Sequence, residues 1–358
     1  MPVDAMEGGM QTSRRSMPEL TTIDLFAGAG GLSVGLRRAG FRVACAVELD
    51  PHAAHSFRLN HRDAEVLVDD IRRVTGPMLT RAARLRGRRL DLLTGCPPCQ
   101  GFSTLRTRRH GVAVPDDRNN LILEYLRLVR SLRPRAIVLE NVPGLALNAG
   151  YRTFCRGLSD AGYDFQSAVV DASDFGVPQR RKRLVLVAVR GGAAPTDWIT
   201  HKVPRPRTVR DAIGGLAAAG SSGDVLHDLP EKRSPEVMRR IRATPRDGGS
   251  RTDLGPDQQC SCHATTDGFF DVYGRMAWSI VAPTITSGCN NPSKGRFLHP
   301  EEHRAITLRE AALLQGFPRN YRFDLTRGKE HVAAQIGNAF PPPLILPIAK
   351  SIAKVLGR

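Results

Sequence analysis

A cysteine on a stiff turn is the residue of this chain best suited to covalent chemistry. The apolar residues Leu90-Asp91-Leu92-Leu93 are followed closely by Gly95-Cys96-Pro97-Pro98-Cys99-Gln100-Gly101-Phe102-Ser103. A strand that ends in Gly, Pro and Pro presents the next side chain on a rigid turn at its carboxyl end, where open α/β sheets carry out their chemistry. The pattern predicts that Cys99 is a nucleophile.

Two other interpretations of this cysteine compete with the first. Cys96 and Cys99 form a CxxC pair, which can be a redox pair when it lies beside alternating strands and helices. A free cysteine also commonly does nothing more than pack in the core. Other segments of the chain must decide between these three hypotheses.

A glycine-rich turn follows the first apolar run. Gly28, Gly30 and Gly31 come just after Phe26, and such glycines let a backbone approach a ligand closely. A dinucleotide-binding loop would need a third glycine where Ser33 stands. Glu48 ends the next apolar run and is suited to binding ribose hydroxyls. Together these residues predict a nucleoside-bearing ligand without a pyrophosphate.

The elements that must position these residues are predicted from apolar runs that alternate with helical segments. A final helix over Leu344–Leu356 is expected to return to the same domain. This alternation is typical of an α/β fold with a doubly wound, mostly parallel sheet. The predicted strands are Leu20–Phe26, Val43–Val47, Leu90–Thr94, Ala136–Leu139 and Leu184–Val189.

In this order the motifs resemble the bacterial type of the DNA (cytosine-5) methyltransferase family. The resemblance extends through Glu140-Asn141-Val142, Gln179–Arg183, Thr307–Pro318 and Gln335–Pro341. It covers roughly residues 21–194 and 305 to the end. It implies S-adenosyl-L-methionine as the cofactor and a smaller, irregular target-recognition domain beside the sheet. Cys96, where relatives usually carry glycine or an aromatic residue, and Phe340, in place of the usual valine, are departures.

The domain organisation follows from the composition, which becomes rich in Gly, Ala, Pro and Ser after Arg190. We expect a disordered leader over residues 1–19 and a catalytic and cofactor-binding domain over 20–194 and 325–358. A target-recognition domain is expected over 195–324, with the determinants of sequence specificity inside 195–300. The Thr307–Pro318 block is predicted to be structural and to carry no chemistry.

The resemblance assigns catalytic roles to four residues. Carbon 5 of cytosine is a weak nucleophile, so the thiolate of Cys99 must first add at carbon 6 of a base flipped out of the DNA. Glu140 is expected to neutralise the charge that develops on nitrogen 3. Arg181 and Arg183, two apart on an extended segment, should face the same way and bind the base oxygen and nearby phosphates.

The neighbours of Arg181 and Arg183 in the chain are expected to point away from the base. Arg180 and Lys182 should point into solvent, because they alternate with the two arginines.

The arginine-rich loop over residues 103–118 is predicted to close over the flipped base.

The same resemblance implies the cofactor contacts. Asp70 and Ile71 are expected to contact adenine, and Asn338 to organise the cofactor site. The full set of expected cofactor-binding residues is Phe26, Gly28, Gly30, Gly31, Glu48, Asp70, Ile71 and Asn338.

Charge and cysteine usage agree with this interpretation. The chain has a net charge of +17, and residues 72–109 contain ten arginines but one acidic residue. Such a surface attracts polyanions and repels its own kind, so we expect double-stranded DNA as the partner and a monomer. The resemblance implies a cognate restriction or phage-defence system as companion. Seven irregularly spaced cysteines and no signal peptide indicate reduced thiols in a bacterial cytoplasm. No apolar run approaches the ~18 residues of a membrane span.

Three alternative functions remain open at this stage, and no metal site is expected. The alternatives are an RNA (tRNA) cytosine-5 methyltransferase of the same fold, a thioredoxin-like oxidoreductase that needs Cys96, and a non-catalytic DNA-binding module. The last two have no use for Glu140. Cys260, Cys262 and His263 lack the spacing of the usual structural zinc sites, so they are not predicted to bind a metal.

Overall fold

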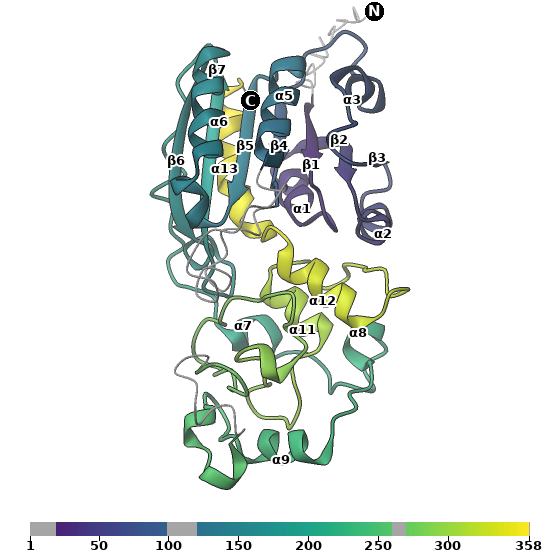
Figure 1. The fold of residues 1–358 in the computed structure, drawn as a ribbon, viewed down its shortest axis with the longest axis vertical. Helices are drawn as coiled ribbons and strands as arrows, with labels where there is room; N and C mark the ends of the chain where they lie inside the picture. The colour runs from purple at the N-terminus through teal and green to yellow at the C-terminus, as the bar shows by residue number, and fades with distance from the viewer. Residues whose placement is uncertain (1–18, 99–119, 260–269, 358) are drawn as a thin grey trace, which may run out of the picture.

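A seven-stranded sheet is the central element of the computed structural model, which describes residues 19–98, 120–259 and 270–357 (Figure 1). The strand order is β3-β2-β1-β4-β5-β7-β6. Neighbouring strands among β1 to β5 are parallel, whereas β7 runs antiparallel to both β5 and β6. The strands are β1 (Leu20–Leu25), β2 (Phe41–Glu48), β3 (Glu65–Val68), β4 (Leu92–Gly95), β5 (Ala136–Asn141), β6 (Tyr163–Asp171) and β7 (Lys182–Arg190).

The predicted α/β fold with a mostly parallel sheet is confirmed. All five predicted strands are present, as β1, β2, β4, β5 and β7. The sequence analysis missed β3 and β6, the two edge strands. Each carries several exposed or half-exposed positions and only one or two buried residues, so neither forms the continuous apolar run that marks a strand buried on both faces.

Helices cover both faces of the sheet. One apolar cluster joins the sheet to α1, α2 and α13, and a second joins its other face to α3, α5 and α6. In Figure 1, α5 and α6 lie in front of the strands and α13 lies behind them. The helices that pack on the sheet are α1 (Gly31–Arg38), α2 (Pro51–Asn60), α3 (Gly76–Ala82), α5 (Leu121–Leu132), α6 (Ala149–Asp160) and α13 (Pro342–Val355).

This double coverage explains the sequence of β5. Ile137 and Leu139 belong to one cluster and Val138 to the other, so consecutive apolar residues are all buried. The last helix, α13, packs against α1, which confirms that the C-terminal helix returns to the sheet.

Short helices and loops form the other part of the molecule, which we call the helical half, as distinct from the sheet half (Figure 1). Its helices are α7 (Val209–Ile213), α8 (Val225–Asp228), α9 (Pro235–Ala243), α11 (Leu308–Leu314) and α12 (Lys329–Asn338). A third apolar cluster lies under α7, α8, α11 and α12. No helix in the described part of the chain is long and apolar enough to cross a membrane.

Local capping and one buried arginine hold the helical half together. The Thr307 hydroxyl and the Glu310 carboxylate form a capping box at the start of α11. Arg275, which is fully buried, donates hydrogen bonds to the carbonyl oxygens of Ile241 and His299, both at 2.7 Å. The Thr307–Pro318 block therefore has the structural role that the sequence predicted.

Candidate active site

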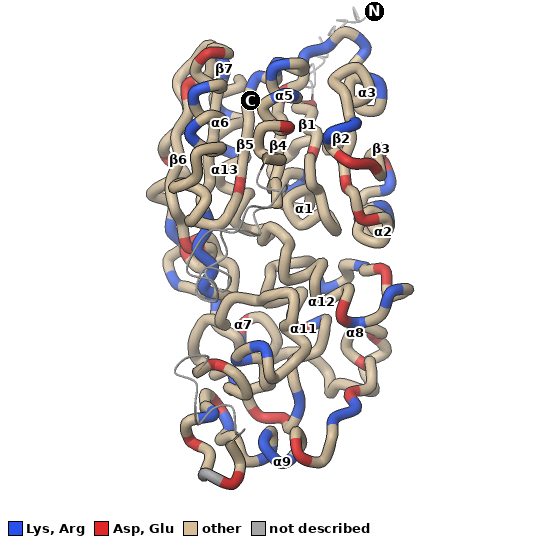
Figure 2. Tube along the Cα trace, in the orientation of Figure 1, with Lys and Arg blue, Asp and Glu red and all other residues tan. Residues whose placement is uncertain are grey.

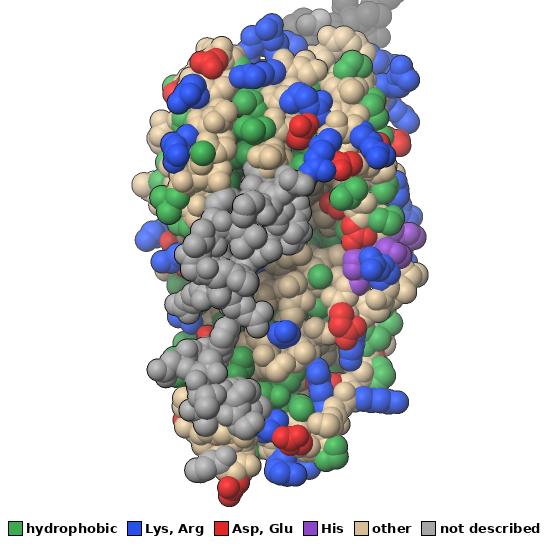
Figure 3. All heavy atoms as spheres, in the orientation of Figure 1, with side chains coloured by type: hydrophobic (Ala, Val, Ile, Leu, Met, Phe, Trp, Pro, Cys, Tyr) green, Lys and Arg blue, Asp and Glu red, His purple; other side chains and the backbone are tan. Residues whose placement is uncertain are grey.

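A cavity of about 780 Å³ lies at the carboxyl edge of the parallel strands. Its wall includes residues at the ends of β1, β2, β4 and β5, the start of β7, and parts of α12 and of the segment 284–287. The face drawn in Figure 3 is hollowed between the sheet half and the helical half. Of the predicted site residues in the described part of the chain, nine line the cavity: Phe26, Gly28, Glu48, Asp70, Ile71, Glu140, Arg181, Arg183 and Asn338.

The glycine turn after β1 holds a carboxylate at the end of β2. Gly28 has a φ of 54°, which favours glycine, and its N–H donates to Glu48 Oε2 at 2.8 Å. Glu48 Oε1 accepts a second hydrogen bond from the Asp50 N–H, also at 2.8 Å. Burial raises the pKa of Glu48 above its usual value, and these backbone hydrogen bonds oppose that rise. The carboxylate is thus fixed at the cavity wall with lone pairs left for a ligand.

Gly30 and Gly31 have a different role from Gly28, because neither is among the described lining residues. A Cβ at Gly30 would lie 2.7 Å from His61 Nε2, and one at Gly31 would lie 2.4 Å from the Phe340 carbonyl oxygen. In this structure the missing side chains make room for α2 and for the C-terminal segment.

The turn that leads to Cys99 is anchored to the end of β5. Asn141 Nδ2 donates to the Pro97 carbonyl oxygen at 2.8 Å. Burial raises the pKa of the Cys96 thiol well above its usual value, and the negative charge of the nearby Glu140 raises it further. A neutral thiol is a poor nucleophile, so Cys96 is not suited to attack a base. The next predicted residue, Cys99, lies outside the described residues.

Glu140 and Arg183 form a buried ion pair. Glu140 is 7% exposed, which rules out a solvent-exposed surface glutamate, and Arg183 Nε lies 2.7 Å from Glu140 Oε1. Arg183 Nη1 also donates to the Lys182 carbonyl oxygen at 2.8 Å. The guanidinium therefore fixes the orientation of the carboxylate at the cavity wall.

Arg181 reaches the same cavity but is bound to backbone. It is 3% exposed and donates to the carbonyl oxygens of Ile285 and Gly337, both at 2.8 Å. Burial lowers the pKa of Arg181 to about 9. The two arginines face the same cavity as their spacing predicted, while Arg180 and Lys182 are exposed.

The remaining predicted cofactor residues lie along one side of the cavity. Ile71 is 4% exposed and offers an apolar surface, and the half-buried Asp70 accepts a hydrogen bond from the Arg72 N–H at 2.9 Å. Asn338 is exposed at the end of α12.

The sequence analysis missed a buried acid in β1. Asp24 lines the cavity and is 1% exposed. The Ser33 hydroxyl donates to its Oδ2 at 2.7 Å and the Thr94 hydroxyl to its Oδ1 at 3.2 Å. Burial raises the pKa of Asp24 from 3.8 to about 7. Only its position before the glycine turn could have pointed to it.

This acid predicts a pH dependence of stability. Between pH 4 and 7 the folded state holds a proton on Asp24 that the unfolded chain has lost, so stability should fall as the pH rises through this window. The slope should approach about 1.4 kcal/mol per pH unit, and Asp24→Asn should remove it. Denaturant titrations at pH 5 and pH 7.5 give the free energy of unfolding of the wild type and of Asp24→Asn at each pH. The exposed Glu330→Gln serves as the control, and an Asp24→Asn protein with the wild-type slope would contradict the assignment.

A second missed feature is the segment 284–287, which crosses the cavity wall. Its Ile285 N–H donates to Gln179 Oε1 at 2.9 Å, and the Thr284 hydroxyl donates to the Arg180 carbonyl oxygen at 2.7 Å. A Cβ at Gly337 would lie 2.1 Å from the Thr286 carbonyl carbon, so this segment packs directly on α12. No hydrophobic period marked these residues in the sequence.

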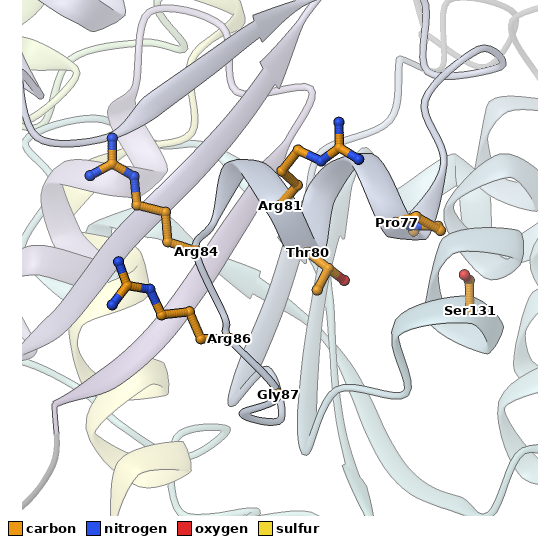
Figure 4. Close-up of a pocket in the computed structure, with 8 residues that line it drawn as sticks. Pro77, Thr80, Arg81, Arg84, Arg86, Gly87 and Ser131 are labelled. Carbon is orange, nitrogen blue, oxygen red and sulfur yellow. The ribbon is translucent and has the colours of Figure 1, made fainter.

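A second hollow, of about 640 Å³, lies away from this cavity, between α3, the loop that precedes β4 and the end of α5. Arg81, Arg84, Arg86 and Ser131 line it, and Arg84 and Arg86 extend in the same general direction (Figure 4). It has no carboxylate or thiol among its described lining residues, so it offers no acid–base or nucleophilic chemistry.

Several predictions fall on segments that the structure does not describe. They concern the leader up to residue 18, the loop over residues 103–118, and Cys260, Cys262 and His263. Within the ranges that are described, no group of three or more His, Cys, Asp or Glu side chains could hold a metal ion.

The sequence of this chain is similar to those of DNA methylases and methyltransferases. Residues 20–354 match the family model described as C-5 cytosine-specific DNA methylase. The Type II methylase M.HgiDII of Herpetosiphon aurantiacus is 39% identical over 347 residues, which span 93% of this chain and 95% of that protein. The Type II methyltransferase M1.HphI of Haemophilus parahaemolyticus is 33% identical over 94% of this chain and 87% of its own length.

Solved structures agree with these matches. An E. coli protein described as a DNA modification methyltransferase encoded within a prophage is 28% identical and superposes with a TM-score of 0.68, over 95% of this chain and 100% of that one. The S. pombe Dnmt2 methyltransferase superposes with a TM-score of 0.63 over 95% of this chain and 100% of that one. At 16% identity the latter shows a common fold.

Proposed function

The chain belongs to the C-5 cytosine-specific DNA methylase family and is a DNA (cytosine-5) methyltransferase, and from this premise we propose that Cys99 forms a covalent adduct with a cytosine flipped out of a specific duplex sequence. One observation supports the mechanism most strongly. The turn that leads to Cys99, the Glu140–Arg183 ion pair and the Glu48 carboxylate all lie on the wall of one cavity. A redox pair or a non-catalytic DNA-binding module would have no use for this arrangement.

The proposed reaction begins with the bond between sulfur and carbon 6. The Cys99 thiolate adds to carbon 6, and the ring electrons move toward carbon 5 and nitrogen 3. S-adenosyl-L-methionine, when bound, supplies an electrophilic methyl group for carbon 5. Transfer of the carbon 5 proton to a proton acceptor then breaks the bond between sulfur and carbon 6, which expels the thiolate and restores the aromatic ring. The target cytosine must leave the base stack, because carbon 6 cannot be reached inside the duplex.

Glu140 and Arg183 are proposed to act on nitrogen 3 and its neighbours. The contact with Arg183 holds the carboxyl group at the cavity wall, where its protonated form would donate a hydrogen bond or a proton to nitrogen 3 and neutralise the charge that develops there. Arg183 is fixed by the Lys182 carbonyl oxygen and can bind the base oxygen with its remaining N–H groups. Arg181, by contrast, is proposed to position the cavity wall through its backbone contacts.

The residues present fit S-adenosyl-L-methionine. The cavity volume falls within the roughly 300–1,000 Å³ of small-molecule sites. Glu48 is suited to the ribose hydroxyls because its carboxylate is fixed by two backbone N–H groups, and Ile71 offers an apolar surface to adenine. Phe26, Gly28, Asp70 and Asn338 complete the described part of the proposed cofactor wall.

Glu48→Ala tests the cofactor site. Loss of charge-assisted hydrogen bonds should cost about 1.5–3 kcal/mol, which is roughly ten- to hundredfold in affinity for S-adenosyl-L-methionine. Isothermal titration calorimetry measures this change. Glu65→Ala, an exposed glutamate on β3, is the matched control. Unchanged binding by Glu48→Ala would exclude Glu48 from the site.

We further propose that the enzyme protects DNA beside a companion nuclease, because the curated relatives are named as Type II enzymes.

Residues 195–324 are proposed to carry target recognition. Exchanging residues 195–300 for the corresponding segment of M1.HphI should change the methylated sequence. Within the exchanged segment, residues 284–287 are kept as in the wild type, since they line the cavity. Bisulfite sequencing of a methylation-free host detects the change, and persistence of the original sequence would place specificity elsewhere.

A further inference from the structure

The second hollow, which we call the basic hollow, lies far from the cavity of the candidate active site. Its described wall holds Arg81, Arg84 and Arg86 together with Thr80 and Ser131, and no Asp or Glu. The loop that leads into β4 and the end of α5, which leads into β5, form much of this wall. The basic hollow is therefore at the amino ends of these strands, whereas the cavity is at their carboxyl ends. In Figure 1, α3 lies at the end of the sheet half that points away from the helical half.

The acid nearest to these arginines in the sequence is bound elsewhere. Asp91 is the one Asp or Glu between residues 72 and 98, and it is buried. Its Oδ1 lies 3.0 Å from Arg135 Nη1, and its Oδ2 accepts a hydrogen bond from the Thr21 N–H at 2.9 Å. The exposed guanidinium groups of Arg84 and Arg86 thus keep their positive charge for a partner outside the chain.

The positive charge continues across this end of the sheet half. Burial raises the pKa of Tyr163, at the start of β6, to about 12, and the charges of Arg190, Arg89 and Arg133 oppose that rise. These three arginines therefore act on the same end of the sheet as the basic hollow. Lys and Arg side chains gather at this end in Figure 3. A broad basic surface of this kind attracts an extended polyanion.

Two of the arginines in the basic hollow have a backbone conformation that favours glycine. The φ angle is 52° at Arg84 and 46° at Arg86. Residues with a Cβ rarely adopt this region, so glycine at either position would suit the loop better. The two side chains extend in the same general direction in Figure 4. A disfavoured conformation that directs two guanidinium groups the same way indicates a role in binding.

We propose that the basic hollow binds the phosphate backbone of a second segment of duplex DNA, while a first segment occupies the cavity side of the molecule. Guanidinium groups bind phosphates through paired N–H groups, and Ser and Thr hydroxyls also contact them. Duplex DNA is the polyanion on which a DNA methyltransferase acts. A single short duplex is too stiff to reach both places, because it would have to bend around the sheet half. Binding two segments at once lets the enzyme pass between them without first dissociating.

Capture of a second duplex on beads tests the proposal. A short duplex that the enzyme methylates is fixed to beads and loaded with the full chain, and a fluorescent duplex that it does not methylate is then added. The wild type should retain the fluorescent duplex, and the double variant Arg84→Ala/Arg86→Ala should retain it about tenfold more weakly. The slope of log affinity against log salt for this second duplex should become shallower by about two, because each lost phosphate contact removes ~0.9.

Two further double variants and one activity assay make the result specific. Arg84→Lys/Arg86→Lys keeps both charges and should recover most of the capture. Arg38→Ala/Arg62→Ala removes two exposed arginines of the sheet half that do not line the basic hollow, and it should capture the second duplex as the wild type does. All three double variants should keep the wild-type kcat and KM on a single short duplex, since none of the substituted residues lines the cavity.

Four outcomes would overturn the proposal. The first is a wild type that retains no second duplex, and the second is equal retention by Arg84→Ala/Arg86→Ala, which would assign bridging to two copies of the chain. Retention of a fluorescent RNA hairpin in place of duplex DNA would exclude DNA as the ligand. A fall in kcat or a rise in KM on the short duplex would mean that these arginines serve the main DNA site. The capture assay measures DNA binding alone, so its result does not depend on the Cys99 mechanism.

Discussion

Cys99→Ser should lower kcat by roughly 10⁴-fold or more, because a serine hydroxyl ionises far less readily than a thiol and is a much weaker nucleophile toward carbon 6. Binding of duplex DNA should change little, since phosphate contacts supply much of the affinity of such proteins. Basic residues are spread over both halves of the chain, as Figure 2 shows. Methyl transfer from radiolabelled cofactor measures kcat, and a DNA-binding titration at fixed salt measures affinity.

Two other cysteine variants make this result specific. Cys155→Ser lies in α6, outside the described cavity wall, and should retain wild-type activity. Cys96→Ser should retain most activity, because the neutral Cys96 thiol is not suited to attack. Loss of activity in Cys96→Ser equal to that in Cys99→Ser would instead indicate a disulfide-forming pair.

Glu140→Gln should lower kcat by about 10²–10⁴-fold, the range expected when general acid–base catalysis is removed. The amide keeps the volume of the side chain but loses the charged contact with Arg183 and cannot give up a proton to nitrogen 3. Single-turnover assays at saturating cofactor and DNA isolate this effect from binding. Glu124→Gln, which removes a half-exposed ion pair with Arg127 on α5, is the control. A kcat for Glu140→Gln within about threefold of the wild type would assign the protonation step to another group.

The positions of Glu48 and Glu140 could be predicted because each residue ends an apolar run. Such runs become strands buried on both faces, and the carboxyl ends of parallel strands meet at one edge of a sheet. This rule brought the glycine turn, both acids and the Pro97–Pro98 turn to the same cavity. It needs no information about contacts between distant segments.

The rest of the cavity wall depends on such distant contacts. Nothing in the local pattern shows that the segment 284–287 packs against Gly337, or that Arg181 binds the Ile285 carbonyl oxygen. Spacing predicted that Arg181 and Arg183 face the same way. It could not show that one binds backbone and the other Glu140.

The pairing of α12 with the cavity was hidden for a related reason. His331 and Gln335 share a helix face, but only the tertiary structure shows that this face meets Asp50 and Ser56. Asp24 was missed because an acid inside an apolar run gives no sign of burial without the Ser33 and Thr94 hydroxyls that surround it.

Covalent trapping tests the central claim most directly. Duplex DNA that carries 5-fluorocytosine at the target position should capture the enzyme in the presence of S-adenosyl-L-methionine, since fluorine cannot leave as a cation and the thiolate is then not expelled. Peptide mapping by mass spectrometry should find the adduct on Cys99, and Cys99→Ser should form none. An adduct on Cys96, or undiminished trapping of Cys99→Ser, would contradict the account.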